Sequence, residues 1–155
     1  YTGEPNYETF QKWVLEAKDW LRLSYIRRQN RVARLKKYLS GRAFTFYMRD
    51  VARKPQDWTL TKFLDSLFNH CFPTNFREIQ RTRYRAYKQN GHPIRDYQRG
   101  LERLAQSVGR IRHRDFILQF WEGADRRMRA HWAREGLSGE RSSLTKLVSY
   151  AERYE

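Results

Sequence analysis

Arginine and lysine side chains, gathered in short clusters, are the groups of this sequence best suited to chemistry. The two densest clusters are Arg27, Arg28, Arg31, Arg34, Lys36 and Lys37, and Arg77, Arg81, Arg83, Arg85 and Lys88. Shorter clusters follow at residues 110–114 and 126–129. Arginine suits phosphate because its planar guanidinium group donates two parallel hydrogen bonds. The clusters therefore predict contacts with nucleic acid, while a solvated helix face is the alternative for any one of them.

Two tyrosines alternate with the arginines of the second cluster. The rings of Tyr84 and Tyr87 could stack on nucleic-acid bases. The same spacing is compatible with burial, and we expect at least one of the two rings to pack into the core.

Groups that catalyse reactions or bind metal ions are sparse. The four histidines, His70, His92, His113 and His131, are scattered, and no two of them lie four residues apart. The chain contains no HExxH, GxSxG, P-loop or GxGxxG motif. Its single cysteine, Cys71, cannot begin a cysteine-rich zinc site and is expected to pack against the apolar end of a helix. We therefore expect no enzyme activity, no catalytic residue, no metal site and no cofactor.

The composition is that of a folded basic domain. Lys and Arg number 32 against 17 Asp and Glu, a net charge of +15, while 39% of the residues are hydrophobic and 15% aromatic. Disordered basic tails lack aromatic residues because they bury no core. Both halves are basic: residues 1–74 hold 14 cations and 7 anions, and residues 75–155 hold 18 and 10. One cysteine excludes a disulfide scaffold, and no apolar run approaches the ~18 residues of a membrane span, so no membrane partner is expected.

Apolar residues recur at spacings of three and four, which predicts an all-α fold of about nine short helices in two lobes. Asn6 to Thr9 can cap a first helix, and Thr59 or Thr61 can open another. The inner stripe of the first helix is Phe10, Trp13, Val14, Ala17 and Leu21, with Trp20 off the stripe and partly exposed. The remaining helices are predicted over residues 27–40, 43–51, 76–89, 94–108, 114–122, 124–135 and 143–154. In the helix over 27–40, Val32, Leu35 and Leu39 are expected to face inward and Arg27, Arg31 and Arg34 to lie near one another.

The order of these features resembles the capsid region of retrotransposon Gag polyproteins. In the first half, the opening Tyr1-Thr2-Gly3-Glu4-Pro5-Asn6 and Trp13 precede Leu39-x-Gly41-x-Ala43-x-x-Phe46-Tyr47, and a helix follows Trp58. The family typically has Trp where Phe46 stands. In the second half, Gln89-x-Gly91-x-Pro93-Ile94-x-Asp96-Tyr97-x-x-x-Leu101-x-x-Leu104 resembles the major homology region of retroviral capsids, with Asn90 separating the usual Gln-Gly pair. Phe116-x-x-x-Phe120-Trp121-x-Gly123 resembles the Phe-x-x-Gly-Leu segment of the family, with Ala124 in place of Leu.

The resemblance implies a gypsy-like retrotransposon capsid, or a domesticated descendant such as the neuronal Arc proteins. Residues 1–73 would form the N-terminal lobe and residues 74–155 the C-terminal lobe. The partners implied are further copies of the chain, arranged in hexamers and pentamers, and packaged RNA. Particles of this kind are expected in the cytoplasm, with the nucleus as an alternative. Because the chain starts at Tyr1 without a methionine, we expect it to be part of a longer protein, in which a zinc knuckle or protease could follow.

Two other functions remain open at this point. The chain could be a domesticated adaptor that binds a peptide or protein ligand in its N-terminal lobe without forming particles. It could also be a helical RNA- or DNA-binding module unrelated to capsids. The resemblance further predicts that Tyr97, Leu101 and Leu104 are buried, with Asp96 in the first turn of their helix, where a carboxylate favours the helix dipole.

Overall fold

A computed structural model describes all 155 residues. The chain is all-α, with nine α-helices and no strand, as the periodicity predicted. It divides into two compact units, Tyr1–Thr74 and Asn75–Glu155. The boundary predicted after residue 73 differs from this division by one residue. No helix is both long and apolar enough to span a membrane.

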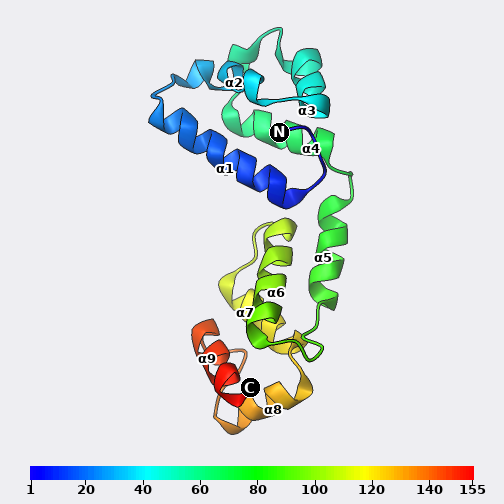
Figure 1. Cartoon of the computed structure of the whole chain (residues 1–155), viewed down its shortest axis with the longest axis vertical. Coiled ribbons are helices and arrows are strands. Elements are labelled where there is room, and N and C mark those ends of the chain that lie inside the picture. The colour runs from blue at the N-terminus through cyan, green and yellow to red at the C-terminus, as the bar shows by residue number, and fades with distance from the viewer. The chain divides into compact units, whose positions relative to one another are not determined.

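The N-terminal unit contains four α-helices connected by tighter turns (Figure 1). The helices are α1 (Tyr7–Leu23), α2 (Arg31–Arg34), α3 (Gly41–Phe46) and α4 (Leu60–Cys71). Single 3-10 turns lie at Arg28–Asn30, Lys36–Tyr38 and Pro55–Asp57, and a π-helical turn, Tyr47–Val51, continues α3. The predicted caps are confirmed: Asn6 accepts a hydrogen bond from the Thr9 amide at 3.0 Å, and Thr59 accepts one from the Lys62 amide at 3.1 Å.

The core of this unit is built from the inner faces of these helices. α1 contributes Phe10, Val14, Ala17 and Leu21, whereas Trp13 of the predicted stripe is only half-buried. The other buried apolar residues are Val32, Leu35, Leu39, Ala43, Phe46, Tyr47, Val51, Phe63, Leu64, Leu67, Cys71 and Phe72. Leu60 and Phe68 of α4 are half-buried at the edge of this core.

The prediction of one helix over residues 27–40 is wrong. Only a single α-helical turn, α2, forms there, between two 3-10 turns. Arg27 is extended, with ψ 144°, so Arg27, Arg31 and Arg34 do not share one helical face. A continuous helix would stack these cations three and four residues apart, and no acid in the stretch offsets their repulsion.

The helix predicted over residues 43–51 forms, but not as one regular helix. It begins at Gly41, where φ is +53°, and changes to a π-helical turn at Tyr47. Tyr47 and Val51, four residues apart, are both buried on the core side of this turn. The connection to α4 contains a 3-10 turn, which starts at Pro55.

The C-terminal unit contains five α-helices. They are α5 (Phe76–Ala86), α6 (Ile94–Val108), α7 (His113–Gly123), α8 (Arg126–Arg134) and α9 (Leu144–Tyr154). α5 and α6 lie side by side as an antiparallel pair (Figure 1). α5 ends at Ala86, three residues before the predicted end at 89, because Tyr87 adopts an extended conformation.

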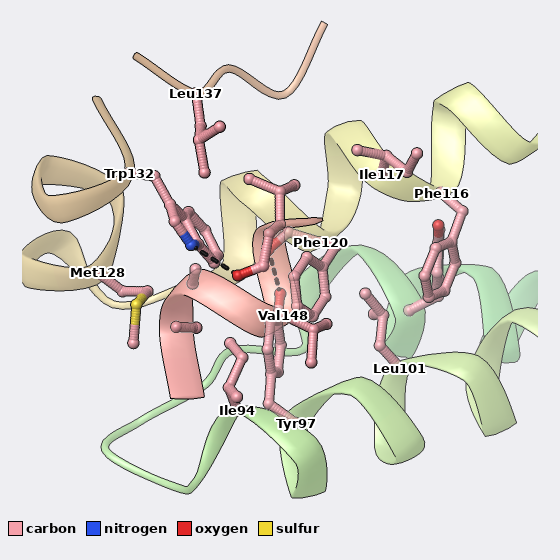
Figure 2. Packing of buried hydrophobic residues seen from close by; sticks show 14 residues of the cluster. Ile94, Tyr97, Leu101, Phe116, Ile117, Phe120, Met128, Trp132, Leu137 and Val148 are labelled. Carbon is pink, nitrogen blue, oxygen red and sulfur yellow. Dashed lines mark hydrogen bonds between the residues drawn. The ribbon is translucent and has the colours of Figure 1, made fainter. Parts of the chain in front are cut away.

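Aromatic rings fill the core of the C-terminal unit (Figure 2). Tyr97 stacks on Phe120 at a centroid distance of 5.1 Å, and Phe120 packs against Trp132 at 5.8 Å. Both polar tips find partners, since the Tyr97 hydroxyl donates to the Phe120 carbonyl at 2.9 Å and the Trp132 indole N–H donates to the Leu147 carbonyl at 2.9 Å. These bonds tie α6 to α7 and α8 to α9 and pair the polar tips of both rings.

Candidate functional site

Gln89, in the loop between α5 and α6, is the most deeply buried polar side chain of the chain. Its exposed fraction is 3%. The side-chain amide donates to the His92 carbonyl at 2.9 Å, and its oxygen accepts from the Asp125 amide at 3.0 Å. The Gln89 backbone amide donates to the Gly123 carbonyl at 2.8 Å. One residue therefore holds the loop closed on itself and fixes it to the chain between α7 and α8.

Asp125 returns a second bond to the same loop. Its carboxylate accepts from the Gly91 amide at 3.0 Å. Asn90 and Gly91 both have positive φ, +48° and +76°, so the turn bends in a way that favours Asn and Gly. The Asn90 insertion thus lies in the bend itself and leaves Gln89 free to point inward. We call Gln89, Gly91, His92, Gly123 and Asp125 the Gln89 network.

Gly123 lets the loop approach the end of α7. A Cβ atom there would lie 2.2 Å from the Tyr97 hydroxyl and 2.6 Å from the Tyr87 carbonyl oxygen. The Tyr97 hydroxyl cannot move away easily because Tyr97 is buried in the core. The Tyr87 carbonyl oxygen cannot do so because it belongs to the backbone. The glycine expected from the Phe116 to Gly123 resemblance is therefore required by the packing around the Gln89 network.

The helix that follows Gln89 buries most of the predicted residues. Tyr97 and Leu101 are buried, and Asp96 lies exposed in the first turn of α6, after Pro93. Burial raises the pKa of the Tyr97 hydroxyl. The backbone amide of Ile94, at the start of α6, has no partner within the helix and donates to the Glu155 carboxylate at 2.7 Å.

Leu104 is half-buried, so its predicted burial is wrong. Ser107 takes the buried position on that end of α6, with 4% exposure. Its hydroxyl donates to the Leu104 carbonyl at 2.7 Å and accepts from the Gln80 amide of α5 at 2.9 Å. Leu104 thus packs at the edge of the core, and a polar contact between α5 and α6 lies beyond it at Ser107.

In the N-terminal unit, the opening segment of the chain packs against the motif that begins at Leu39. The Tyr1 nitrogen donates to the Tyr38 carbonyl at 2.7 Å, and the Ser40 amide donates to the Tyr1 carbonyl at 2.9 Å. Gly3, with φ +94°, lies so close to α3 that a Cβ atom would be 2.9 Å from the Ala43 nitrogen. The opening segment and the segment from Leu39 to Ala43 therefore pack as one substructure.

The aromatic residues of the same motifs pack around Phe46. Its ring stacks on His70 at 5.1 Å and meets Trp58 edge-on at 6.4 Å. Trp58 is half-buried, with the Lys62 ammonium 4.8 Å from its ring centroid. Trp13 stacks on Tyr1 at 5.7 Å. These contacts give each motif residue a place in or beside the core of the N-terminal unit.

No family model, curated protein or solved structure matches the chain. The residues and their geometry are therefore the basis of the functional argument. Two features carry it: the Gln89 network of the C-terminal unit and the basic surfaces of both units.

Residues 20–49 contain nine Lys and Arg and no Asp or Glu. We call this stretch the acid-free segment. The first predicted cluster lies within it, and Arg27, Arg28, Arg34, Lys36 and Lys37 are all exposed. Arg31 is half-buried and donates to the Ile26 carbonyl at 3.2 Å, so it holds the local chain. The Lys37 ammonium lies 5.7 Å from the Trp20 ring centroid and 5.3 Å from that of Tyr38.

The second cluster runs along α5. Arg81, Arg85 and Lys88 are exposed. Arg77 donates to the Ser107 carbonyl at 3.4 Å, and Arg83 donates to Gln80 at 3.1 Å. Arg81 and Arg85, four residues apart, lie on the same side of the helix.

The two tyrosines of this cluster are not available for stacking. Tyr84 is buried, and Tyr87 is half-buried and stacks on Tyr97 at 5.8 Å. Burial, with a smaller effect of the Asp115 carboxylate, raises the pKa of Tyr84 to about 12. The expectation that at least one of them packs into the core is confirmed.

The shorter clusters are partly structural. Arg114 donates to the carbonyl oxygens of Gly139 and Ser142, each at 2.9 Å, and so holds the loop before α9. Arg110, Arg112, Arg126 and Arg127 are exposed. No group of three His, Cys, Asp or Glu side chains comes together in a way that could hold a metal ion. Cys71 is buried at the end of α4, and burial raises the pKa of its thiol.

An apolar groove of about 210 Å³ lies on the N-terminal unit. It is lined by Trp13, Glu16, Ala17 and Trp20 of α1 and by Tyr38. Trp20 is half-buried, as predicted, and meets Tyr38 edge-on at 5.1 Å. A groove with this lining suits a small apolar side chain of a ligand.

Proposed function

We propose that this chain is the capsid region of a Gag protein, from a long-terminal-repeat retrotransposon or a domesticated descendant, that self-assembles into particles enclosing RNA. The Gln89 network is the observation that carries the proposal. Gln89 and Gly91 lie in the segment that resembles the major homology region, and Gly123 lies in the second motif of the same unit, so the network joins two segments that the resemblance singles out. A buried glutamine that closes its own loop and joins it to residues 123–125 is a costly feature to keep for packing alone, since each unpaired partner would lose about 1–3 kcal/mol.

The arrangement of the chain supports the same proposal. Two compact helical units divide after Thr74, one residue from the boundary that the resemblance implies between N-terminal and C-terminal lobes. Such lobes assemble through weak contacts repeated with closed symmetry, since contacts that do not close produce filaments. The function is therefore one of assembly, with no reaction required of any side chain.

The acid-free segment and the exposed cations of α5 supply the RNA contacts. Arg27, Arg28, Arg34, Arg81 and Arg85 are exposed, and none of them pairs with a carboxylate. Cations without partners release condensed counterions when they bind phosphate, which makes the affinity steeply dependent on salt. With six to ten phosphate contacts, RNA affinity should fall about 10³- to 10⁵-fold between about 50 and 200 mM salt. An affinity that is negligible or independent of salt would contradict the RNA contacts.

Electron microscopy of the purified protein with RNA, at low and high salt, tests assembly. Closed particles are the expected result. A monomer that binds RNA in a salt-sensitive way would favour the helical nucleic-acid-binding module instead.

The peptide-binding adaptor is the second candidate, and the groove beside Trp20 is the observation that favours it. A peptide that enters this groove should change the fluorescence of Trp13 and Trp20 and leave the protein monomeric. Replacing Ala17, at the floor of the groove, with Leu should abolish that change. Peptide binding without particles at any salt concentration would establish the adaptor in place of the capsid.

A further inference from the structure

Tyr25 combines an unfavourable backbone conformation with an almost fully exposed side chain. It follows α1, with φ +53°, and 92% of its side chain is exposed. Its ring packs on no other ring, and its hydroxyl makes no hydrogen bond within the chain. By contrast, Trp20 packs on Tyr38 and Trp58 packs on Phe46 in the same unit.

The hydrogen bonds of the turn explain why φ is positive at this position, but they do not explain why the residue there is a tyrosine. The Ile26 amide donates to the Leu21 carbonyl at 3.4 Å, and the Tyr25 amide donates to the Arg22 carbonyl at 3.3 Å. These two bonds form the Schellman motif that ends many helices, and its left-handed position is usually occupied by glycine. Tyrosine there destabilises the turn, and the side chain makes no hydrogen bond or ring contact that offsets that cost. The side chain is therefore available to a partner outside the fold.

The surroundings of Tyr25 identify the chemistry of its partner. Tyr25 lies inside the acid-free segment, and the exposed Arg27 and Arg28 follow it directly after Ile26. Leu23, two residues earlier, is 70% exposed. An exposed ring followed along the chain by unpaired, exposed arginines is a combination with which proteins hold single-stranded nucleic acid, where bases stack on the ring and phosphates meet the cations.

We propose that Tyr25 is a base-stacking residue for single-stranded nucleic acid, with Arg27 and Arg28 bound to the adjoining phosphates. The proposal deepens the RNA contact of the proposed function and rests on it. A second copy of the chain that docks through the same surface is the less favourable partner, because it would bring the cations Arg27 and Arg28, which pair with no carboxylate, against the same charges. Duplex RNA is also less favourable, since its bases are paired and stacked and present no free face.

The test compares two single strands of about 12 nucleotides, one with bases and one abasic, which carry the same phosphates. Fluorescence anisotropy measures the affinity of the whole chain for each. The wild-type protein should bind the strand with bases about 5- to 100-fold more tightly than the abasic strand. Tyr25→Ala should remove that preference and leave binding of the abasic strand unchanged, whereas Tyr25→Trp should retain the preference.

Two control variants separate stacking from charge. Arg27→Ala combined with Arg28→Ala should weaken binding of both strands by the same factor and reduce the salt dependence. Tyr154→Ala removes an exposed tyrosine of the other unit and should change neither affinity. Thermal unfolding of each variant shows whether the fold is retained, and Tyr25→Ala should unfold at or above the wild-type temperature because its side chain supports no contact.

The remaining outcomes contradict the proposal in distinguishable ways. Equal wild-type affinity for the two strands would overturn base stacking while leaving the RNA contact of the proposed function intact. Failure to bind either strand would overturn both. A Tyr25→Ala variant that keeps the base preference but loses self-association would assign the ring to a second copy of the chain.

Discussion

The Gln89 side-chain oxygen accepts a hydrogen bond from the Asp125 amide at 3.0 Å, across 36 residues of sequence. The Asp125 carboxylate in turn accepts from the Gly91 amide, two residues after Gln89. This reciprocal pair fixes the loop before α6 to the start of α8. The segment that resembles the major homology region is thus held by side chains that lie far from it in the sequence.

Replacing Gln89 with Ala should destabilise the C-terminal unit by about 2–4 kcal/mol. The change removes the partner of the His92 carbonyl and of the Asp125 amide in two part-buried hydrogen bonds, and each loss costs about 1–3 kcal/mol. Urea unfolding followed by circular dichroism measures the difference. Gln106→Ala is the matched control, since Gln106 is exposed on α6 and its loss should change stability by less than about 0.5 kcal/mol. Equal effects of the two variants would show that the Gln89 network does not support the fold.

Leu101→Ala should cost about 2–5 kcal/mol, because Leu101 is completely buried between helices of the C-terminal unit. Leu104→Ala, on the same helix, should cost less, since Leu104 is half-buried. Chemical denaturation of both variants gives the comparison. A Leu101→Ala variant as stable as the wild type would contradict the placement of α6 in the core.

The buried hydroxyl groups of Tyr84 and Tyr97 differ in their hydrogen bonding, so removing them should change stability differently. The Tyr84 hydroxyl has no hydrogen-bond partner, whereas that of Tyr97 donates to Phe120. Tyr84→Phe should therefore be neutral or slightly stabilising, and Tyr97→Phe should cost about 1 kcal/mol. Thermal unfolding at neutral pH distinguishes them. A larger loss for Tyr84→Phe than for Tyr97→Phe would contradict these hydrogen-bond assignments.

The raised pKa of Tyr84 predicts that the fold loses stability at alkaline pH. The folded-state pKa of Tyr84 is raised to about 12, from about 10 in the unfolded chain. Because only the unfolded state loses this proton above pH 10, stability is complete below about pH 10 and falls as the pH rises toward 12. Tyr84→Phe should make that decline shallower in a pH series of urea midpoints. An identical decline in the wild type and the variant would show that Tyr84 does not titrate as its burial requires.

Tyr25→Gly should stabilise the N-terminal unit by about 1 kcal/mol, because glycine adopts the positive φ of the Schellman motif without strain. Ser24→Gly is the control at the neighbouring position, where φ is −89°. It should be neutral or destabilising, since glycine there only adds freedom to the unfolded chain. The melting temperatures of the two variants measure these changes. A lower melting temperature for Tyr25→Gly than for the wild type would show that the tyrosine side chain stabilises the fold.

Local patterns predicted much of the fold. The caps at Asn6 and Thr59, the buried face of α1 and the start of α6 near Pro93 depend on residues within a few positions of one another. Spacing alone could not predict how residues 27–40 break into short turns, because the repulsion among unpaired cations opposes the apolar periodicity. It also placed Leu104 inward, where the polar contact of Ser107 with Gln80 determines the packing.

The residues of the candidate site likewise include some that the sequence predicts and some that only the folded chain brings together. Gln89 and the basic clusters could be named from the sequence, since their residue types and spacing carry the signal. Asp125 could not be named as the partner of Gln89, because that contact depends on how α7 and α8 fold back. Tyr25 was missed because the sequence shows only a tyrosine after a helix, whereas its positive φ and exposure are properties of the folded turn.

Nuclease protection of RNA in the assembled fraction tests the central claim most directly. The purified protein is mixed with RNA at low salt, treated with ribonuclease, and separated by sedimentation. The capsid proposal predicts a fast-sedimenting fraction that contains intact RNA, which becomes digestible when high salt weakens the contacts with phosphate before the nuclease is added. Complete digestion of the RNA at low salt, with all protein sedimenting as a monomer, would contradict it.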